Sequence, residues 1–468
     1  MEGIDKIKTG KILFKNTIYH NIMSKITEAL KAARETKALL VGAGVLQDVA
    51  KLFTGQFPGE KAVIIADNNT YPAAGQAVEH FIKNAGIKQD MPFIFTDPQL
   101  YADYKYVNEL TAFLKNTDAI PIAVGSGTIN DLTKLSSLLT GRQYMCVATA
   151  ASMDGYTAFG ASITANGAKQ TFNCPAPQVC LADLDVISKA PVEMTASGYA
   201  DLFAKVTAGA DWILADMLNI EPIDEQAWDI VQGGLHDALS DPEGVKTGRL
   251  DSVSKLIEGL MLGGFAMQWS QSSRPASGAE HQFSHLWNME HHLNNGEHVS
   301  HGFQVSIGTI AITAFYEQLL KTPIEKIDID NACKAWPTAE KSDEMALKIF
   351  KETDFPEIGV QETRAKYIDK SQLREQLILL VERWPEIKLK LEKQLVAFDE
   401  AKARLKTVGA PIEPEEIGIT RKRLRETFIR SQYIRRRFTI LDLAIRTNLF
   451  DRWLDGLFGK SGIWEICE

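Results

Sequence analysis

The sequence predicts an α/β N-terminal domain with a parallel sheet, followed by an all-α C-terminal domain. At 468 residues the chain is longer than one hydrophobic core usually serves. Short apolar runs alternate with helical stretches in the first part, whereas only long helical patterns follow Pro191. We therefore expect two domains, at residues 1–195 and 196–468.

The N-terminal sheet is predicted from five short apolar runs. They cover residues 38–41, 62–66, 92–95, 119–124 and 144–148. Continuous apolar runs that are separated by helical stretches indicate strands buried on both faces, as in a parallel sheet. These runs are therefore expected to be parallel strands of one sheet.

The C-terminal part is expected to be entirely helical. Its helical patterns cover residues 197–217, 251–269, 301–320, 371–383 and 385–404. Residues 321–366 show too little pattern to be placed. No internal repeat or low-complexity linker separates the two parts.

The composition restricts the classes of function. The formal net charge is −9, which argues against a general affinity for nucleic acid or for an anionic membrane. The chain shows no signal-peptide pattern at its N-terminus, and no segment approaches the roughly 18 uninterrupted apolar residues of a membrane span. The five cysteines are scattered and indicate buried thiols in a reducing compartment. We expect a soluble, cytoplasmic protein that acts on a small molecule.

A glycine-bearing turn follows the predicted strand 119–124. It includes Gly125, Ser126, Gly127, Asn130 and Asp131. Glycines between a strand and a helix let backbone amides approach a pyrophosphate, and the helix N-terminus adds favourable partial charge. Because the third glycine of the dinucleotide fingerprint is missing, an ordinary strand-to-helix turn is an equally good interpretation.

Asp67 follows the predicted strand 62–66 directly. A carboxylate at the end of such a strand often binds the adenosine ribose in dinucleotide-binding folds, where it favours NADH over NADPH. The alternative is that Asp67 forms a turn or caps a helix.

Six of the nine histidines fall between His281 and His301, and this density points to a metal site. Ser277 and Glu280 have the capping-box pattern, which predicts a helix from residue 278. His281 and His285 then lie four residues apart on one helix face. Spacing alone does not separate a pair of ligands from one ligand and one substrate-binding residue.

His301 begins another amphipathic helix, where a ligand would be stiffly held. The candidate third ligand is Asp201, a carboxylate in an otherwise apolar stretch. The alternative is a buried ion pair between Asp201 and Lys205. Three further histidines, His291, His292 and His298, lie in a polar stretch that predicts a loop, and we leave them out of the site.

Taken together, five segments resemble the glycerol-1-phosphate dehydrogenases, particularly their bacterial branch. This family lies within the superfamily of dehydroquinate synthases and iron-containing alcohol dehydrogenases. The segments are GSGTIND at 125–131, TAASMDG at 149–155, DLFAK at 201–205, SRPASGAEH at 273–281 and HG at 301–302. The resemblance covers roughly residues 35 to 320 and is looser from Lys321 onward.

The resemblance implies roles for individual residues. Asp201, His281 and His301 would be the metal ligands, and Asp154 and His285 would be catalytic residues that face the substrate. The dinucleotide would be held by Gly125, Ser126, Gly127, Asn130, Asp131, Thr149 and Ser152. Ala158 is a departure, because relatives are expected to have a serine there that touches the cofactor.

The implied activity is a reversible, NAD(P)-dependent reduction of dihydroxyacetone phosphate to sn-glycerol 1-phosphate, a step of phospholipid biosynthesis. One divalent metal, zinc, nickel or iron, would act as a Lewis acid. His285 would donate a proton or only hydrogen-bond the substrate. The phosphate requires cations, and Lys205 and Arg274 flank the proposed ligands and could bind the substrate there. We also expect a homo-oligomer, in the form of a dimer.

The basic run 421–437 contains two clusters of arginine and lysine. Its apolar spacing predicts a solvated, charged helix face, although the run could also reach the site. Three other functions stay open: a metal-dependent dehydrogenase of another polyol or polyol phosphate, a dehydroquinate-synthase-like lyase, and an inactive binding protein.

Overall fold

A computed structural model of the chain describes residues 11–12, 20–165 and 168–466. The chain divides into two compact units. Unit 1 comprises Met1–Leu202 and Gln226–Ser273, and unit 2 comprises Phe203–Glu225 and Arg274–Glu468. This division differs from the predicted boundary at residue 195, because residues 226–273 group with the sheet.

Unit 1 contains a seven-stranded parallel sheet with the order β1-β2-β9-β6-β5-β3-β4. Its strands are β1 (Lys11–Ile12), β2 (Ala38–Gly42), β3 (Ala62–Asp67), β4 (Phe93–Phe95), β5 (Ile120–Gly125), β6 (Met145–Ala148) and β9 (Val179–Asp183). All five predicted strands are confirmed. The sequence reasoning missed the two-residue strand β1, the strand β9, which contains Cys180, and the antiparallel hairpin of β7 (Ala161–Ala165) and β8 (Ala168–Phe172).

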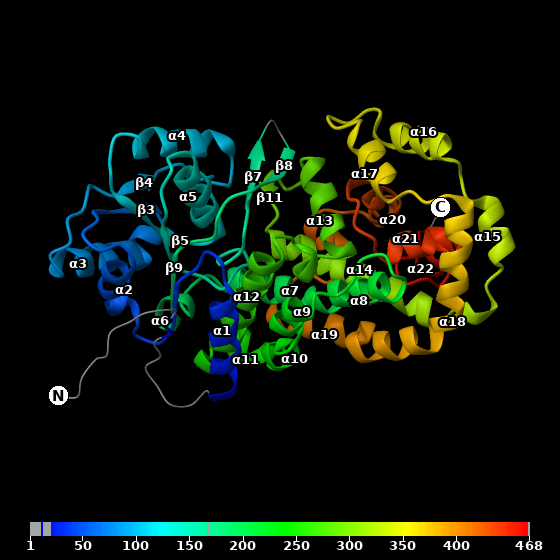
Figure 1. Ribbon diagram of the computed structural model, residues 1–468, viewed down its shortest axis with the longest axis horizontal. Coiled ribbons are helices and arrows are strands. Elements are labelled where there is room, and N and C mark those ends of the chain that lie inside the picture. The colour runs from blue at the N-terminus through cyan, green and yellow to red at the C-terminus, as the bar shows by residue number, and fades with distance from the viewer. Residues whose placement is uncertain (1–10, 13–19, 166–167, 467–468) are drawn as a thin grey trace. The chain divides into compact units, whose positions relative to one another are not determined.

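Helices cover both faces of this sheet (Figure 1). One face carries α2 (Val49–Gln56) and α3 (Gln76–Asn84), and the other carries α4 (Tyr104–Leu114) and α5 (Gly127–Leu139). The unit also contains α1 (His20–Ala32), α6 (Leu184–Ile187), α9 (Glu225–Gln232), α10 (Leu235–Ala238), α11 (Pro242–Lys246) and α12 (Leu250–Ser270). The central strands are apolar over most of their length because both of their faces are buried, as the neighbouring residues Ile64 and Ile65 illustrate.

Unit 2 is built from helices, as predicted. Its longer helices are α8 (Lys205–Met217), α13 (Ala279–Met289), α14 (His301–Lys321), α16 (Ala339–Phe350), α18 (Lys370–Gln394), α19 (Phe398–Val408) and α20 (Arg421–Ser431). Shorter ones are α15 (Ile329–Ala335), α17 (Ile358–Lys366), α21 (Ile440–Arg446) and α22 (Phe450–Phe458). Among the described residues of unit 2, the two-residue strands β10 (Leu293–Asn294) and β11 (Glu297–His298) are the only strands.

Two predicted helices have different bounds. The pattern over 197–217 is broken at Ala204 into α7 (Val192–Phe203) and α8. Conversely, α18 continues through Pro385, where the sequence pattern suggested a new helix. Proline removes one backbone donor, but Trp384, Ile387 and Leu391 bury one face of α18 and keep it continuous.

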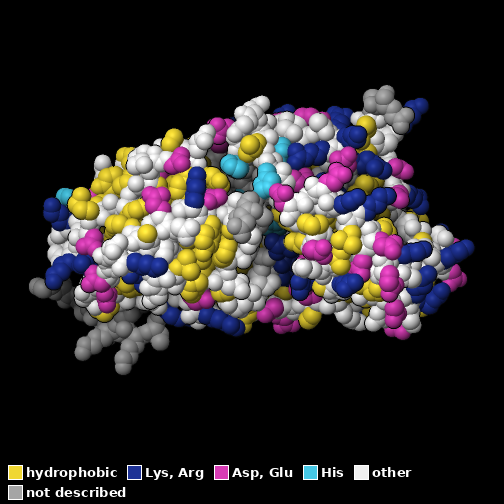
Figure 2. All heavy atoms as spheres, turned by 90° about the horizontal axis from the view of Figure 1, so that it is seen from above, with side chains coloured by type: hydrophobic (Ala, Val, Ile, Leu, Met, Phe, Trp, Pro, Cys, Tyr) yellow, Lys and Arg dark blue, Asp and Glu magenta, His cyan; other side chains and the backbone are white. Residues whose placement is uncertain are grey.

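Figure 2 shows basic and acidic side chains interspersed on the face that it presents, without a continuous basic patch. In the described part of the chain, helices of the length and hydropathy needed to cross a membrane are absent. The four described cysteines are buried thiols, as predicted, and Cys467 lies outside the described residues.

Candidate metal and cofactor site

His281 lies in the first turn of α13, and its ring orientation is set by the residue before it. Nδ1 of His281 is 2.7 Å from Oε1 of the fully buried Glu280. A carboxylate only accepts, so Nδ1 has the proton and Nε2 has the lone pair that a metal requires. Burial alone would raise the pKa of Glu280, but hydrogen bonds with His281 and the Gly278 N–H outweigh it and lower that pKa.

The predicted capping box at this helix is wrong in its first residue. The N-cap is Gly278, and no side chain caps it. Glu280 instead accepts from the Gly278 N–H at 2.6 Å and from the Thr207 hydroxyl at 2.9 Å. The glutamate that the pattern assigned to capping therefore also orients His281.

His301 begins α14 and is oriented in a similar way. The Ser284 hydroxyl donates to Gln304 Oε1 at 2.9 Å and lies 3.2 Å from Nδ1 of His301. A hydroxyl has one proton to donate, so Ser284 accepts from Nδ1 of His301 and Nε2 again has the lone pair. The ring centroids of His281 and His301 are 5.3 Å apart.

Among the residues that the structure describes, one group of histidine, cysteine and acidic side chains could hold a metal: Asp201, His281 and His301. Each offers one ligand atom, and these atoms lie within 4.8 Å of one another. Asp201 is completely buried, and its Oδ2 accepts from the Asp154 N–H at 3.0 Å. One carboxylate and two imidazoles form a donor set that fits a divalent transition metal.

Asp154, a predicted substrate residue, lies on a loop that packs closely on α7. A Cβ at Gly198 would lie 1.9 Å from the carbonyl oxygen of Ala151, so only glycine permits this approach. The Ser197 hydroxyl also donates to the carbonyl of Ser152. The helix that contains Asp201 and the loop that contains Asp154 are thus held together through backbone.

The predicted pyrophosphate turn joins β5 to α5. Ser126 is the N-cap of α5, and its side chain makes no capping hydrogen bond. A Cβ at Gly125 would lie 2.5 Å from Ile129, and one at Gly127 would lie 3.1 Å from Met153. Close packing therefore requires glycine at position 125, whereas at position 127 the flexible Met153 side chain could give way. The first amides of α5 begin directly after these residues.

Asn130 and Asp131 mainly organise the loop that follows β6. Asn130 is buried and donates to the Gly155 carbonyl, while Asp131 accepts from the Ser162 N–H at 3.1 Å. Lys134, one helical turn on, is completely buried and donates to the carbonyls of residues 155, 158 and 160. Sequence reasoning missed Lys134, although a lysine between apolar helix positions was the available signal.

Three other predicted cofactor residues lie at strand ends of unit 1. Asp67 Oδ1 accepts from the N–H groups of Asn69 and Thr70, so the turn-forming interpretation is realised. The Thr149 N–H donates to the Gly125 carbonyl at 3.2 Å. Ser152 accepts at its carbonyl as described above.

The two predicted phosphate-binding cations are both buried in unit 2. Lys205 is the first residue of α8 and is fully buried. Arg274 donates through Nη1 to the Phe438 carbonyl and through Nη2 to the Asp211 carbonyl, and its Nε lies 3.3 Å from Glu221. Arg274 therefore ties the segment before α13 to its neighbours.

His285, a predicted catalytic residue, contacts Arg435, which belongs to the basic run whose approach to the site the sequence analysis left open as an alternative. Nη2 of Arg435 donates to Nε2 of His285 at 3.0 Å. An arginine cannot accept, so Nε2 of His285 has the lone pair and its proton lies on Nδ1. The predicted solvated face is realised at Arg421 and Lys422 on α20, but it is wrong for Arg435 and Arg437, which are half-buried.

The remaining histidines of the cluster have other partners. His292 is buried and bonds to the Ile417 carbonyl and to Arg423, and His291 pairs with Asp354. His298 is exposed on β11. These contacts agree with the prediction that His291, His292 and His298 do not belong to the metal site.

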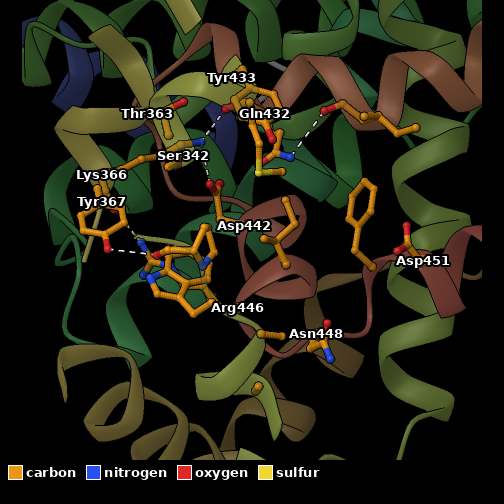
Figure 3. Close-up of a pocket in the computed structure, with 18 residues that line it drawn as sticks. Ser342, Thr363, Lys366, Tyr367, Gln432, Tyr433, Asp442, Arg446, Asn448 and Asp451 are labelled. Carbon is orange, nitrogen blue, oxygen red and sulfur yellow. Dashed lines mark hydrogen bonds and ion pairs between the residues drawn. The ribbon is translucent and has the colours of Figure 1, made fainter. Parts of the chain in front are cut away.

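A separate cavity of about 370 Å³ lies within unit 2 (Figure 3). Trp336 and Tyr367 stack at its edge, and Lys366 forms a 2.6 Å ion pair with Asp442. Arg446 donates to the Lys366 carbonyl at 2.8 Å. Lys366 and Asp442 therefore compensate each other's charge, and the cavity lining contains none of the metal-ligating residues.

The sequence is similar to those of known proteins. The iron-containing alcohol dehydrogenase family matches residues 40–191. A glycerol-1-phosphate dehydrogenase of Halalkalibacterium halodurans is 35% identical over 56% of this chain and 66% of that protein. One of Bacillus velezensis is 31% identical over 62% of this chain and 74% of that protein.

The chain belongs to the glycerol-1-phosphate dehydrogenase family. The predicted resemblance is confirmed. The chain spans just under two thirds of the Halalkalibacterium relative, at 66% of its length. A solved structure of glycerol dehydrogenase from Schizosaccharomyces pombe has a TM-score of 0.55 at 14% identity and covers 89% of each chain. At 14% identity, this likeness shows that the two proteins share a two-domain fold.

Proposed function

We propose that this protein reduces dihydroxyacetone phosphate reversibly to sn-glycerol 1-phosphate, with NAD(P)H as the hydride donor and one divalent metal. The observation that carries the proposal is the pair of imidazoles whose Nδ1 atoms are engaged by Glu280 and Ser284. This arrangement directs two Nε2 lone pairs to metal binding beside a buried carboxylate. The names of the relatives favour a phosphorylated triose as the substrate.

Asp201, His281 and His301 would hold the metal, which is zinc, nickel or iron in this proposal. When bound, the metal supplies Lewis-acid polarisation of the ketone, and the nicotinamide supplies hydride. Glu280 and Ser284 keep the imidazoles in the binding tautomer. The Asp154 N–H positions the Asp201 carboxylate.

His285 would hydrogen-bond the substrate oxygen. Its hydrogen bond with Arg435 leaves a single proton on the neutral ring, at Nδ1, and this N–H would donate to the developing alkoxide without being given up. The proton that the alkoxide takes up would come from water. In unit 1, the turn 125–127 and the N-terminus of α5 would bind the cofactor pyrophosphate.

The test is NADH and NADPH oxidation by metal-reconstituted protein with dihydroxyacetone phosphate. The expected result is stoichiometric oxidation of cofactor and formation of sn-glycerol 1-phosphate, which would be a precursor for phospholipid synthesis. Dihydroxyacetone and other polyol-derived ketones are the comparison substrates. A better rate with one of these would indicate another polyol dehydrogenase. Bound cofactor that cycles without net oxidation would indicate a lyase instead.

A further inference from the structure

Three consecutive arginines between η6 (Gln432–Ile434) and α21 face different ways. The backbone at Arg435 is extended, with φ −146° and ψ 139°, and side chains of extended backbone alternate between two sides. Arg436 is exposed and forms a two-pronged ion pair with Glu362. Arg435 and Arg437 are half-buried and point toward the region of α13.

Arg435 connects this segment to the histidines of the candidate site. Its Nη2 lies 3.0 Å from His285 Nε2. The ring centroids of His285 and His281 are 6.4 Å apart, and those of His281 and His301 are 5.3 Å apart. All of these residues belong to unit 2. A ketone held at His281 and His301 would therefore have a substituent a few bonds away within reach of Arg435.

The half-buried arginines concentrate positive charge at this place. Arg435 donates to a neutral imidazole and Arg437 to the carbonyl of Ser277. Burial, followed by the positive charges of Arg274 and Arg435, lowers the pKa of Arg437 to about 9. A bound anion would compensate the cost of burying these positive charges. The guanidinium group can donate two parallel hydrogen bonds to the oxygens of a phosphate.

We propose that Arg435 and Arg437 bind the phosphate group of the substrate and so determine its specificity for a phosphorylated triose. This inference rests on the proposed function and names the phosphate subsite of the same site. Arg274 is less suited to that role, because both of its Nη groups already donate to backbone carbonyls. The half-buried Arg435 and Arg437, in contrast, have exposed surface that a ligand can reach.

The first experiment compares Arg435→Met, Arg437→Met and the matched control Arg436→Met. Each is assayed with dihydroxyacetone phosphate and with dihydroxyacetone at saturating NADH. We expect the efficiency ratio of phosphorylated to unphosphorylated substrate to fall roughly ten- to hundredfold in the first two variants. Arg436→Met should keep the wild-type ratio, because its exposed guanidinium pairs with Glu362 instead of facing the histidines.

The second experiment does not depend on turnover. Binding of inorganic phosphate to the metal-loaded protein is measured by calorimetry, and circular dichroism checks that each variant is folded. Wild type and Arg436→Met should bind phosphate, whereas Arg437→Met should bind it at least tenfold more weakly. Retained phosphate binding together with an unchanged substrate ratio would overturn the proposal.

The same measurements separate this inference from its alternatives. A rise in the KM for NADH, with an unchanged substrate ratio, would assign the arginines to the cofactor phosphates and overturn the proposal. If wild type binds phosphate through Arg437 but fails to oxidise NADH with dihydroxyacetone phosphate, the subsite stands. In that case the proposed function fails.

Discussion

At the scale of single residues, the neighbours of a histidine decide whether it can bind a metal. His281 and His301 each engage Nδ1 with an acceptor in their own unit. His292 instead uses both ring nitrogens, one with the Ile417 carbonyl and one with Arg423. The sequence alone shows a dense cluster of histidines, and it separates the two kinds only by their polar or apolar surroundings.

Replacing His281 or His301 by alanine should abolish stoichiometric metal binding, since two of the three ligands are imidazoles. The measurement is metal content after reconstitution and gel filtration. His298→Ala is the control, because this histidine is exposed on β11 and lies outside the group. Unchanged metal content in both ligand variants would refute the assignment.

Asp67→Asn should shift cofactor preference toward NADPH, because the carboxylate would repel a 2′-phosphate. Asparagine retains an oxygen that can accept from Asn69 and Thr70, so the turn should persist. The readout is the ratio of kcat/KM for NADH and NADPH. An unaltered ratio in the folded variant would leave Asp67 with a structural role alone.

At the scale of elements, the sequence pattern predicted the strands, whose position depends on local burial. It did not predict contacts that depend on tertiary packing. The five strands were readable because burial on both faces demands apolar residues at every position. The function of Glu280 was not readable, since capping and histidine orientation use the same residue at the same spacing. Nor could spacing show that Lys134 on α5 donates to the loop around Gly155, because that contact is set by the packing of α5.

Glu258 on α12 should make stability depend on pH. Ser254 donates to its Oε1 at 2.7 Å, its buried Oε2 has no hydrogen-bond partner in the described structure, and burial raises its pKa to about 7. Because the folded state holds the proton more tightly than the unfolded state, protonated Glu258 contributes its full stabilisation below about pH 4.5. This stabilisation is lost as the pH rises through 7. The loss is up to about 3 kcal/mol.

The test is urea unfolding of wild type and Glu258→Gln at pH 5 and pH 8. Glutamine mimics the protonated form, so the variant should lose less stability between the two pH values. Glu60→Gln, at an exposed position, should keep the wild-type difference. Equal pH dependence in wild type and Glu258→Gln would show that Glu258 is ionised throughout.

At the scale of the whole molecule, the chain passes between its two units at residues 202–203, 225–226 and 273–274. A sequence-based boundary marks a change of pattern, and such a change occurs near residue 195. It cannot show that α12 returns to the unit of the sheet, because that return depends on packing with α1, α10 and α11. The family resemblance becomes looser from Lys321 onward, and it therefore implied no role for Arg435 or Arg437.

Removing the metal should lower the thermal unfolding temperature of the intact protein. A ligand that binds only the folded state stabilises it by about 2.7 kcal/mol when present at one hundred times its Kd. The proposed donors come from α7, α13 and α14, so stabilisation should extend to all three helices. Scanning calorimetry with chelator and with added metal checks this, and His281→Ala should show no metal-dependent shift.

The close contact between Gly198 and the Ala151 carbonyl limits how this site can vary during evolution. Since the main chain of α7 touches the main chain of the loop at Gly198, no side chain larger than the hydrogen of glycine fits at that position. Alanine at 198 would push α7 outward and carry Asp201 with it. We therefore expect variation at the site in the metal-ligating side chains and in their hydrogen-bonding neighbours. The spacing between the loop at Ala151 and helix α7 should stay the same.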